Sequence, residues 1–313
     1  MADLIPQSGT RKAKPRFRFA PSPNGRLHLG HAYSALFAEQ AALKAGGELL
    51  LRIEDIDQTR TKPEFVDGIL EDMDWLGIRF APNLRRQSDH FSDYRSALDR
   101  LDKMGLLYPC PATRREIEAD IAGRVAGGKV DGEWPRDPDG AQLYPGTWRD
   151  RNPGEYEKLH DSKKPVALRL HMARTIAEFE RRNILPISFK EEGTGPSGET
   201  GQVSLDPAIW GDVVLARKET PTSYHLSVVV DDADQGITHI TRGHDLFYAT
   251  AIHRLLQILL DLPKPVYCHH HLIRANDTRK LSKSASDTSL ASLRNAGIGS
   301  REIRRALGFF DTA

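Results

Sequence analysis

The spacing of apolar and polar residues predicts a strand–helix–strand unit near the start of the chain. An apolar run at 17–20 leads into the Pro- and Gly-containing segment 21–25, which cannot be helical. After Gly30, apolar residues recur at helical spacing as far as Lys44. The run Leu49, Leu50, Leu51 and Ile53, apolar except for Arg52, is typical of a parallel strand buried on both faces. Such a unit gathers functional groups at the carboxyl ends of its strands.

The later pattern predicts a second α/β half. We expect helices at 63–75, 88–104 and 247–260, and two short helices at 287–295 and 300–308. We expect strands at 166–170, 213–216, 224–230, 237–241 and 266–273. Residues 121–165 are rich in Gly, Pro and Asp, which predicts an exposed insertion.

Composition excludes several classes of protein. The 44 Lys and Arg residues balance 43 Asp and Glu, so a polyanion such as RNA must be bound by a local patch. Two cysteines cannot form a disulfide framework, and no stretch approaches the ~18 apolar residues of a membrane span, so we expect a cytoplasmic protein. The candidate RNA contacts are Arg85–Arg86, Arg114–Arg115, Arg181–Arg182, Arg301, Arg304 and Arg305. Such clusters are also common on solvated faces.

Two short motifs carry residues suited to phosphate chemistry. His28-Leu29-Gly30-His31 stands where the first helix begins, so its imidazoles and the helix N-terminus could bind phosphate. The alternative is a capped helix with surface histidines. Lys280-Leu281-Ser282-Lys283-Ser284 follows the last predicted strand, and its lysines could bind a leaving pyrophosphate. The alternative is a solvated loop.

Together the two motifs resemble the HIGH and KMSKS signatures of class I aminoacyl-tRNA synthetases. Segments between them resemble the glutamyl branch of that family: Arg18-Phe-Ala-Pro-Ser-Pro, Arg52-Ile-Glu-Asp-Ile-Asp57, Gln87-Ser88, Tyr224-His-Leu-Ser-Val-Val-Val-Asp-Asp232 and Thr241-Arg242-Gly243. The resemblance extends from Arg16 to Phe309. It implies an α/β, Rossmann-like catalytic domain with an inserted smaller α+β subdomain and a short helical C-terminal tail.

The resemblance also implies boundaries within the chain. We expect an N-terminal tail at 1–15, catalytic halves at 16–107 and 201–285, an inserted subdomain at 108–200 and a helical tail at 286–313.

Site residues follow from the same resemblance. For catalysis and ATP binding it implies His28, Gly30, His31, Lys280, Ser282 and Lys283, and for glutamate binding it implies Arg18, Phe19, Ala20, Pro21, Ser22, Glu54, Tyr224 and Arg242. Glu54 suits the substrate ammonium, and the two arginines suit its carboxylates. The alternatives are that Glu54, Asp55 and Asp57 cap or solvate a loop, and that Arg242 pairs with Asp231 or Asp232.

Few residues follow the second motif, too few for an anticodon-binding domain. This resembles the glutamyl-queuosine tRNA(Asp) synthetase subfamily, which implies ATP-dependent activation of glutamate, Mg²⁺ with the ATP, and transfer of glutamate to queuosine in tRNA(Asp). We expect a monomer. Two alternatives stay open: a shortened glutamyl-tRNA synthetase that charges a tRNA 3′ end, and a non-catalytic tRNA- or nucleotide-binding relative.

Two cysteine-containing segments raise the question of a metal. Relatives often carry a zinc site in the inserted subdomain, but Cys110 and Tyr144 are all that remain of that pattern, and Trp148 stands where a cysteine would fall. Because a structural zinc needs four ligands, we predict no zinc and packing of Trp148 in its place. The run 268–271, Cys-His-His-His, cannot converge on one ion from a strand, and we expect one of its histidines at the ATP side of the pocket.

Replacement of Lys283 tests the proposed pyrophosphate clamp. Lys283→Ala should lower the rate of adenylate formation at least about tenfold, equivalent to roughly 1.4 kcal/mol of transition-state stabilisation. Glutamate-dependent exchange of pyrophosphate into ATP measures this rate. An unchanged rate would remove Lys283 from the mechanism.

Overall fold

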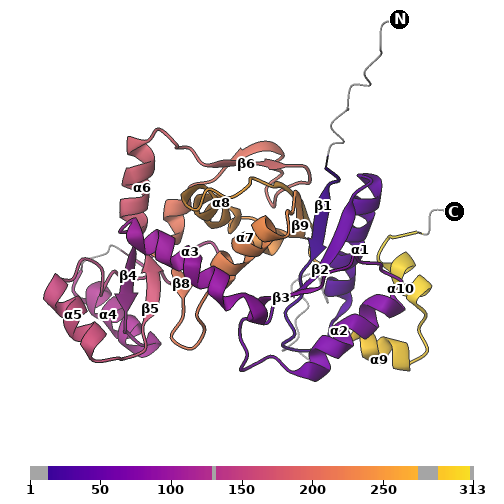
Figure 1. The fold of residues 1–313 in the computed structure, drawn as a ribbon, viewed down its shortest axis with the longest axis horizontal. Coiled ribbons are helices and arrows are strands. Elements are labelled where there is room, and N and C mark those ends of the chain that lie inside the picture. Colours follow the sequence, from indigo (N-terminus) through magenta and orange to yellow (C-terminus); the bar gives the residue numbers. More distant parts are fainter. Residues whose placement is uncertain (1–12, 129–131, 274–287, 311–313) are drawn as a thin grey trace, which may run out of the picture.

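The computed structural model describes residues 13–128, 132–273 and 288–310, and these form an elongated molecule with helices around a central parallel sheet (Figure 1). Among these residues, no helix is long and apolar enough to cross a membrane.

The central sheet joins the two predicted halves of the chain. Its first strands pair in parallel in the order β1-β2-β3, and the second group has the order β7-β6-β10-β9. The backbone N–H of Thr238, next to β9, donates to the carbonyl of Arg16 in β1 over 3.0 Å, so the two groups meet edge to edge. The strands are β1 (Arg16–Phe19), β2 (Glu48–Ile53), β3 (Arg85–Arg86), β6 (Ser188–Glu191), β7 (Gly201–Ser204), β9 (His239–Gly243) and β10 (Val266–His270).

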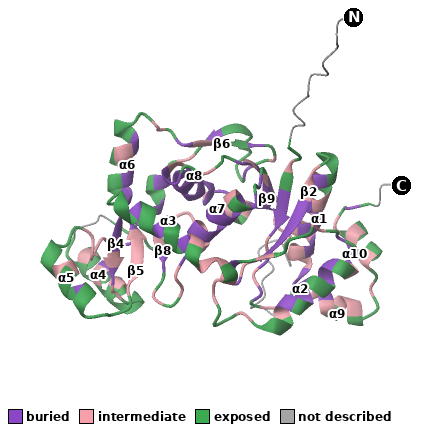
Figure 2. Ribbon diagram, in the orientation of Figure 1, coloured by how far each residue is buried: buried purple, intermediate pink, exposed green. Residues whose placement is uncertain are grey.

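Helices pack against this sheet, and some lie beyond its edge at one end of the molecule (Figure 1). The helices of the catalytic region are α1 (Leu29–Lys44), α2 (Pro63–Trp75), α3 (Phe91–Lys103), α7 (Tyr224–Asp234), α8 (Thr250–Leu259), α9 (Leu290–Asn295) and α10 (Ser300–Ala306). Short 3-10 turns lie at Gln87–His90, Pro207–Trp210 and His244–Leu246. One apolar core lies among α3, α7 and α8, and another lies between α1, α2 and the first strands, where α9 and α10 add Leu290 and Ile303. Figure 2 shows this burial along the sheet, α7 and α8.

A smaller sheet lies at the other end of the molecule (Figure 1). Its antiparallel order is β4-β5-β8, with β4 (Leu107–Cys110), β5 (Ala167–Leu170) and β8 (Val214–Ala216), and its helices are α4 (Arg114–Ala126), α5 (Pro153–Asp161) and α6 (Met172–Arg181). Strand pairing does not follow the expected boundary at residue 200. Strand β6 precedes this boundary but pairs with β10 of the central sheet, whereas β8 follows it but pairs with β5 of the smaller sheet.

The predicted elements agree with the structure where their periodicity is strong. The first strand–helix–strand unit is confirmed, and the helix at 63–75 has the predicted bounds. The predicted strand at 224–230 is wrong, because these residues begin helix α7. Residues 226–232 are all buried, so this part of the helix has no exposed face that would reveal a helical period in the sequence. The insertion at 121–165 is less irregular than expected, since it holds the end of α4 and all of α5.

Aromatic packing occupies the position of the expected zinc remnant. Tyr108, Cys110 and Tyr144 form a small buried cluster, against which Trp148 and Tyr156 pack. The Tyr144 hydroxyl accepts the backbone N–H of Trp148 over 2.9 Å and lies 3.3 Å from the Cys110 sulfur. The predicted packing of Trp148 is confirmed. Within the described ranges, no group of three or more His, Cys, Asp or Glu side chains could hold a metal ion.

The absence of zinc remains a prediction with a direct measurement. Untagged protein purified from zinc-supplemented medium should contain far less than one zinc per chain by elemental analysis, because Cys110 and Tyr144 offer at most two ligands where four are needed. Stoichiometric zinc that survives dialysis would contradict it.

Candidate active site

A cavity of about 1140 Å³ opens at the carboxyl ends of the parallel strands. Loops that follow β1 and β2 supply Ser22 and Glu54, and the ends of β9 and β10 supply Arg242 and His270. This edge is where parallel α/β sheets bind their ligands. The predicted residues that line the cavity are Arg18, Phe19, Ala20, Pro21, Ser22, His28, Gly30, His31, Glu54, Tyr224 and Arg242.

The two histidines of the first motif cap helix α1 reciprocally. His28 Nδ1 accepts the backbone N–H of Gly30 over 3.1 Å, and His31 Nδ1 accepts the backbone N–H of His28 over 3.2 Å. Each neutral ring therefore carries its proton on Nε2, the nitrogen that can donate to a phosphate oxygen. The sequence suggested that the helix N-terminus would offer its amides to phosphate, but the Gly30 amide is already paired with His28.

Lys280, Ser282 and Lys283 lie outside the described residues. The chain on either side of segment 274–287 is anchored at the cavity. Leu272 and Ile273 line it, and Ser289 forms a backbone bridge with His28.

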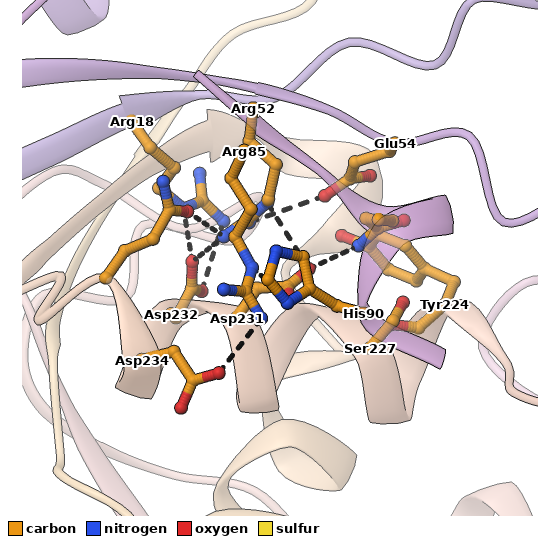
Figure 3. A network of polar contacts seen from close by, with 12 residues as sticks. Arg18, Arg52, Glu54, Arg85, His90, Tyr224, Ser227, Asp231, Asp232 and Asp234 are labelled. Carbon is orange, nitrogen blue, oxygen red and sulfur yellow. Dashed lines mark hydrogen bonds and ion pairs between the residues drawn. The ribbon is translucent and has the colours of Figure 1, made fainter. Parts of the chain in front are cut away.

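Arg18 and Glu54 belong to one buried ion-pair network (Figure 3). Arg18 Nε donates to Asp232 Oδ1 over 3.0 Å, and Arg52 Nη1 donates to the same oxygen over 2.8 Å. Arg52 Nη2 lies 3.4 Å from Glu54 Oε1. The carboxylate of Asp232, on α7, thereby orients Arg18 on β1, and Arg52 on β2 orients Glu54.

Asp231 anchors the same helix from its other side. Its carboxylate accepts from Arg85 Nε (2.7 Å), Gln87 Nε2 (2.7 Å) and the Tyr94 hydroxyl (2.8 Å). These bonds fix helix α7, whose first residue, Tyr224, lines the cavity. Arg85 therefore forms ion pairs within the protein rather than a contact to RNA, because its side chain is only 11% exposed and also pairs with Asp234.

Arg242 has a different environment from the other arginines. Its guanidinium donates to His269 Nε2 (3.1 Å), His253 Nδ1 (2.8 Å) and Thr250 Oγ1 (2.6 Å). Within the described part of the chain, no carboxylate forms an ion pair with it. The alternative that Arg242 pairs with Asp231 or Asp232 is wrong, since Arg18, Arg52 and Arg85 hold those carboxylates.

The cavity therefore combines groups suited to an amino acid with a second carboxylate. Glu54 offers a carboxylate to an ammonium, and Arg242 offers a cation that no carboxylate of the described residues neutralises. The histidines at the start of α1 suit the phosphates of a nucleotide.

Comparison with known proteins agrees with this chemistry. Residues 14–309 match the family model of the tRNA synthetases class I (E and Q), catalytic domain. The chain belongs to this synthetase family. It is 46% identical to "Glutamyl-Q tRNA(Asp) synthetase" of Rhodobacter capsulatus over 93% of this chain and 99% of that protein.

Matches to glutamate--tRNA ligases cover a smaller share of those proteins. The synthetase chain is 36% identical to "Glutamate--tRNA ligase" of Prochlorococcus marinus, over 91% of this chain and 56% of that protein. The crystal structure of the glutamate-tRNA synthetase from Elizabethkingia anophelis matches with a TM-score of 0.68 and 26% identity, over 87% of this chain and 53% of that one. The expected class I catalytic fold is confirmed.

The two other acidic residues of the second-strand motif have structural partners in this synthetase. Asp55 accepts the backbone N–H and hydroxyl of Ser88, both over 2.8 Å. Asp57 accepts from Thr59 and Arg60 in the next turn. The loop-stabilising alternative thus holds for Asp55 and Asp57, whereas Glu54 faces the cavity.

The histidine run of β10 separates as its strand geometry predicted. His269 points to Glu191 in the interior, and His270 lines the cavity and packs against Tyr33 and Phe37. Sequence reasoning missed Glu191, His253 and Thr250. Thr250 and His253 lie 8 and 11 residues after Arg242, on helix α8, and Glu191 acts through His269, which lies 78 residues away in the chain. The motif 52–57 did contain Arg52, but the sequence did not show that its partner lies on α7.

The protonation of Glu54 provides a pH test of its role. Burial raises the pKa of the Glu54 carboxyl to about 7, against the opposing effect of Arg52 and Arg18. A carboxyl with a raised pKa is protonated below pH 7, and only the ionised form attracts an ammonium. Affinity for glutamate should therefore rise from pH 6 to pH 8, by at most about tenfold per pH unit, and then level off.

Calorimetric titration with glutamate measures this dependence. Glu54→Gln should bind weakly with no such rise, whereas Glu118→Gln on the distant helix α4 should keep it. Affinity that is independent of pH in the unmodified protein would exclude Glu54 as the ammonium ligand.

Proposed function

We propose that this synthetase activates glutamate with ATP and transfers it to queuosine in the anticodon loop of tRNA(Asp). The observation that carries the proposal is the 46% identity over 99% of a protein named glutamyl-Q tRNA(Asp) synthetase. The cavity supplies the chemistry, because Glu54 and Arg242 complement the ammonium and one carboxylate of glutamate.

In the first step, the α-carboxylate oxygen of glutamate attacks the α-phosphorus of ATP, and pyrophosphate leaves. His28 and His31, whose Nε2 protons follow from the caps of α1, donate to phosphate oxygens as charge develops. We propose that Lys280 and Lys283 bind the departing pyrophosphate and that Ser282 adds a hydroxyl donor. In the second step, a hydroxyl of the queuosine cyclopentene ring attacks the glutamyl carbonyl, and AMP leaves.

Arg18 and Arg242 have distinct parts in binding glutamate. Arg242 holds one carboxylate of the substrate, because within residues 13–128, 132–273 and 288–310 it contacts only neutral acceptors. Arg18 is already paired with Asp232 and contributes its remaining donors beside Tyr224 and Ser22. Phe19, Ala20 and Pro21 form the adjoining wall.

Mg²⁺ accompanies the ATP and neutralises its phosphates. The described residues contain no cluster of three or more potential metal ligands. We propose that the synthetase acts as a monomer. ATP and tRNA are cytoplasmic substrates, and we expect the reaction there.

Transfer of labelled glutamate tests the acceptor. Transfer should occur to tRNA(Asp) that carries queuosine and should be at least about a hundredfold lower with the same tRNA lacking it, because the attacking hydroxyl is then absent. A queuosine-containing tRNA(Asp) with a 2′,3′-dideoxy 3′ end is the matched control, since transfer to it should persist.

Other outcomes identify the alternatives. Loss of transfer with the dideoxy tRNA, together with charging of tRNA that lacks queuosine, would indicate a synthetase that acts on the 3′ end. The absence of both transfer and glutamate-dependent pyrophosphate exchange would indicate a non-catalytic tRNA-binding relative.

A further inference from the structure

Arg242 is held by three neutral acceptors rather than by a carboxylate. A guanidinium has five N–H bonds and can only donate, so His269 Nε2, His253 Nδ1 and Thr250 Oγ1 must all accept from it. These contacts use Nε and one N–H on each terminal nitrogen. Two N–H bonds are left, one on each terminal nitrogen, which is the arrangement that binds a carboxylate in a bidentate manner.

The acceptor state of His269 depends on Glu191. Glu191 Oε2 lies 2.5 Å from His269 Nδ1, and this carboxylate holds the ring proton on that nitrogen. The opposite nitrogen, Nε2, is then an acceptor for Arg242. Burial lowers the pKa of His269 to about 4. The hydrogen bond to Glu191 opposes this shift and the charge of Arg242 adds to it, so the ring is neutral near pH 7.

The other oxygen of Glu191 is fixed by the backbone. Oε1 accepts the N–H of His269 over 2.9 Å and the N–H of Gly193 over 2.8 Å. A Cβ at Gly193 would lie 2.5 Å from the His269 carbonyl oxygen and 2.9 Å from Glu191 Oε1. The chain therefore needs glycine at this point, because only glycine allows the turn to close around the carboxylate.

His253 likewise accepts a hydrogen bond from Arg242, at the terminal nitrogen Nη1. Burial lowers the pKa of His253 well below its ordinary value, and Arg242 lowers it further, so this ring is also neutral. Its other ring nitrogen lies 3.2 Å from His225 Nδ1, which can accept its proton. Both imidazoles thus orient the guanidinium without neutralising its charge.

We propose that Glu191 and His269 are positioning residues that set the tautomer needed to aim Arg242, which pairs with no carboxylate among the described residues, at a substrate carboxylate. A carboxylate placed directly on Arg242 would compete with the substrate. An imidazole between Glu191 and Arg242 instead leaves the two remaining N–H groups of the guanidinium for the substrate carboxylate. The proposal rests on the proposed function for the identity of that substrate as glutamate.

Glu191→Gln should reverse the tautomer of His269 with little change in the size of the side chain. The two backbone N–H groups at Oε1 require an acceptor, so the amide oxygen of Gln takes that place and its NH₂ faces His269 Nδ1. The imidazole proton then moves to Nε2, where it meets the Nε–H of Arg242. We expect the KM for glutamate in pyrophosphate exchange to rise at least about tenfold, with the KM for ATP unchanged within about twofold.

Matched variants separate this effect from a general loss of structure. Glu191→Asp retains an acceptor for the Nδ1 proton, so its KM for glutamate should rise less than about threefold. Glu192→Gln removes the neighbouring carboxylate, which pairs with exposed Lys190, and should behave as the unmodified protein. Equal effects of Glu191→Gln and Glu192→Gln would overturn the proposal, as would equal effects on glutamate and ATP.

Nitrogen NMR of the histidine side chains reports the tautomer without any enzymatic assay. His269 should carry its proton on Nδ1 in the unmodified protein and on Nε2 in Glu191→Gln. A proton on Nε2 in the unmodified protein would overturn the proposal even if the synthetase transfers glutamate to queuosine. Conversely, the expected tautomers together with no transfer to queuosine would reject the proposed acceptor and leave this proposal standing.

Thr250→Val provides an independent variant if Glu191→Gln fails to fold. It removes one acceptor of Arg242 at nearly constant volume and leaves the pair of Glu191 and His269 intact. The KM for glutamate should rise about three- to tenfold while the His269 tautomer and the KM for ATP stay unchanged. An unchanged KM for glutamate in this variant would count against the aiming of Arg242 by neutral acceptors.

Discussion

Arg52 is completely buried, and the arrangement of the site depends on the carboxylates that surround it. Its guanidinium joins β2 to helix α7 through Asp232 at 2.8 Å and Asp231 at 3.8 Å, and it reaches Glu54 at 3.4 Å. Removal of one partner from such a buried network typically costs about 3–5 kcal/mol, because a charge is left uncompensated. Arg52 therefore links the two catalytic halves and determines where Glu54 points.

The site uses two electrostatic arrangements for its cations. Arg18 and Arg52 lie in a network with Asp231 and Asp232, so their charges are balanced within the protein (Figure 3). Arg242 is as buried as Arg18 but meets only neutral acceptors in the described structure. A buried cation without a counterion is costly, and a bound carboxylate relieves that cost. This difference explains why selectivity for an acidic amino acid would reside mainly at Arg242.

The smaller sheet shows how the subdomain packs around Cys110 and Tyr144. Tyr144 and Trp148 pack with Cys110, and nearby Asp212 accepts from the Tyr108 hydroxyl, Arg149 Nε over 2.7 Å and the backbone N–H of Met172 over 2.9 Å. Apolar contacts and hydrogen bonds to one carboxylate thus tie segments that are distant in the sequence.

The sequence by itself determined the first strand–helix–strand unit, the helix at 63–75 and the positions of the site motifs, because these depend on local periodicity, Pro and Gly. It predicted a strand where α7 lies, since the buried run at 226–230 is apolar except for Ser227, has no exposed face and contains three valines. Only the tertiary structure decided that Asp232 pairs with Arg18 and that Glu191 sets His269 against Arg242. These partners lie 214 and 78 residues apart in the chain, and their pairing depends on strand order and packing rather than on any local pattern.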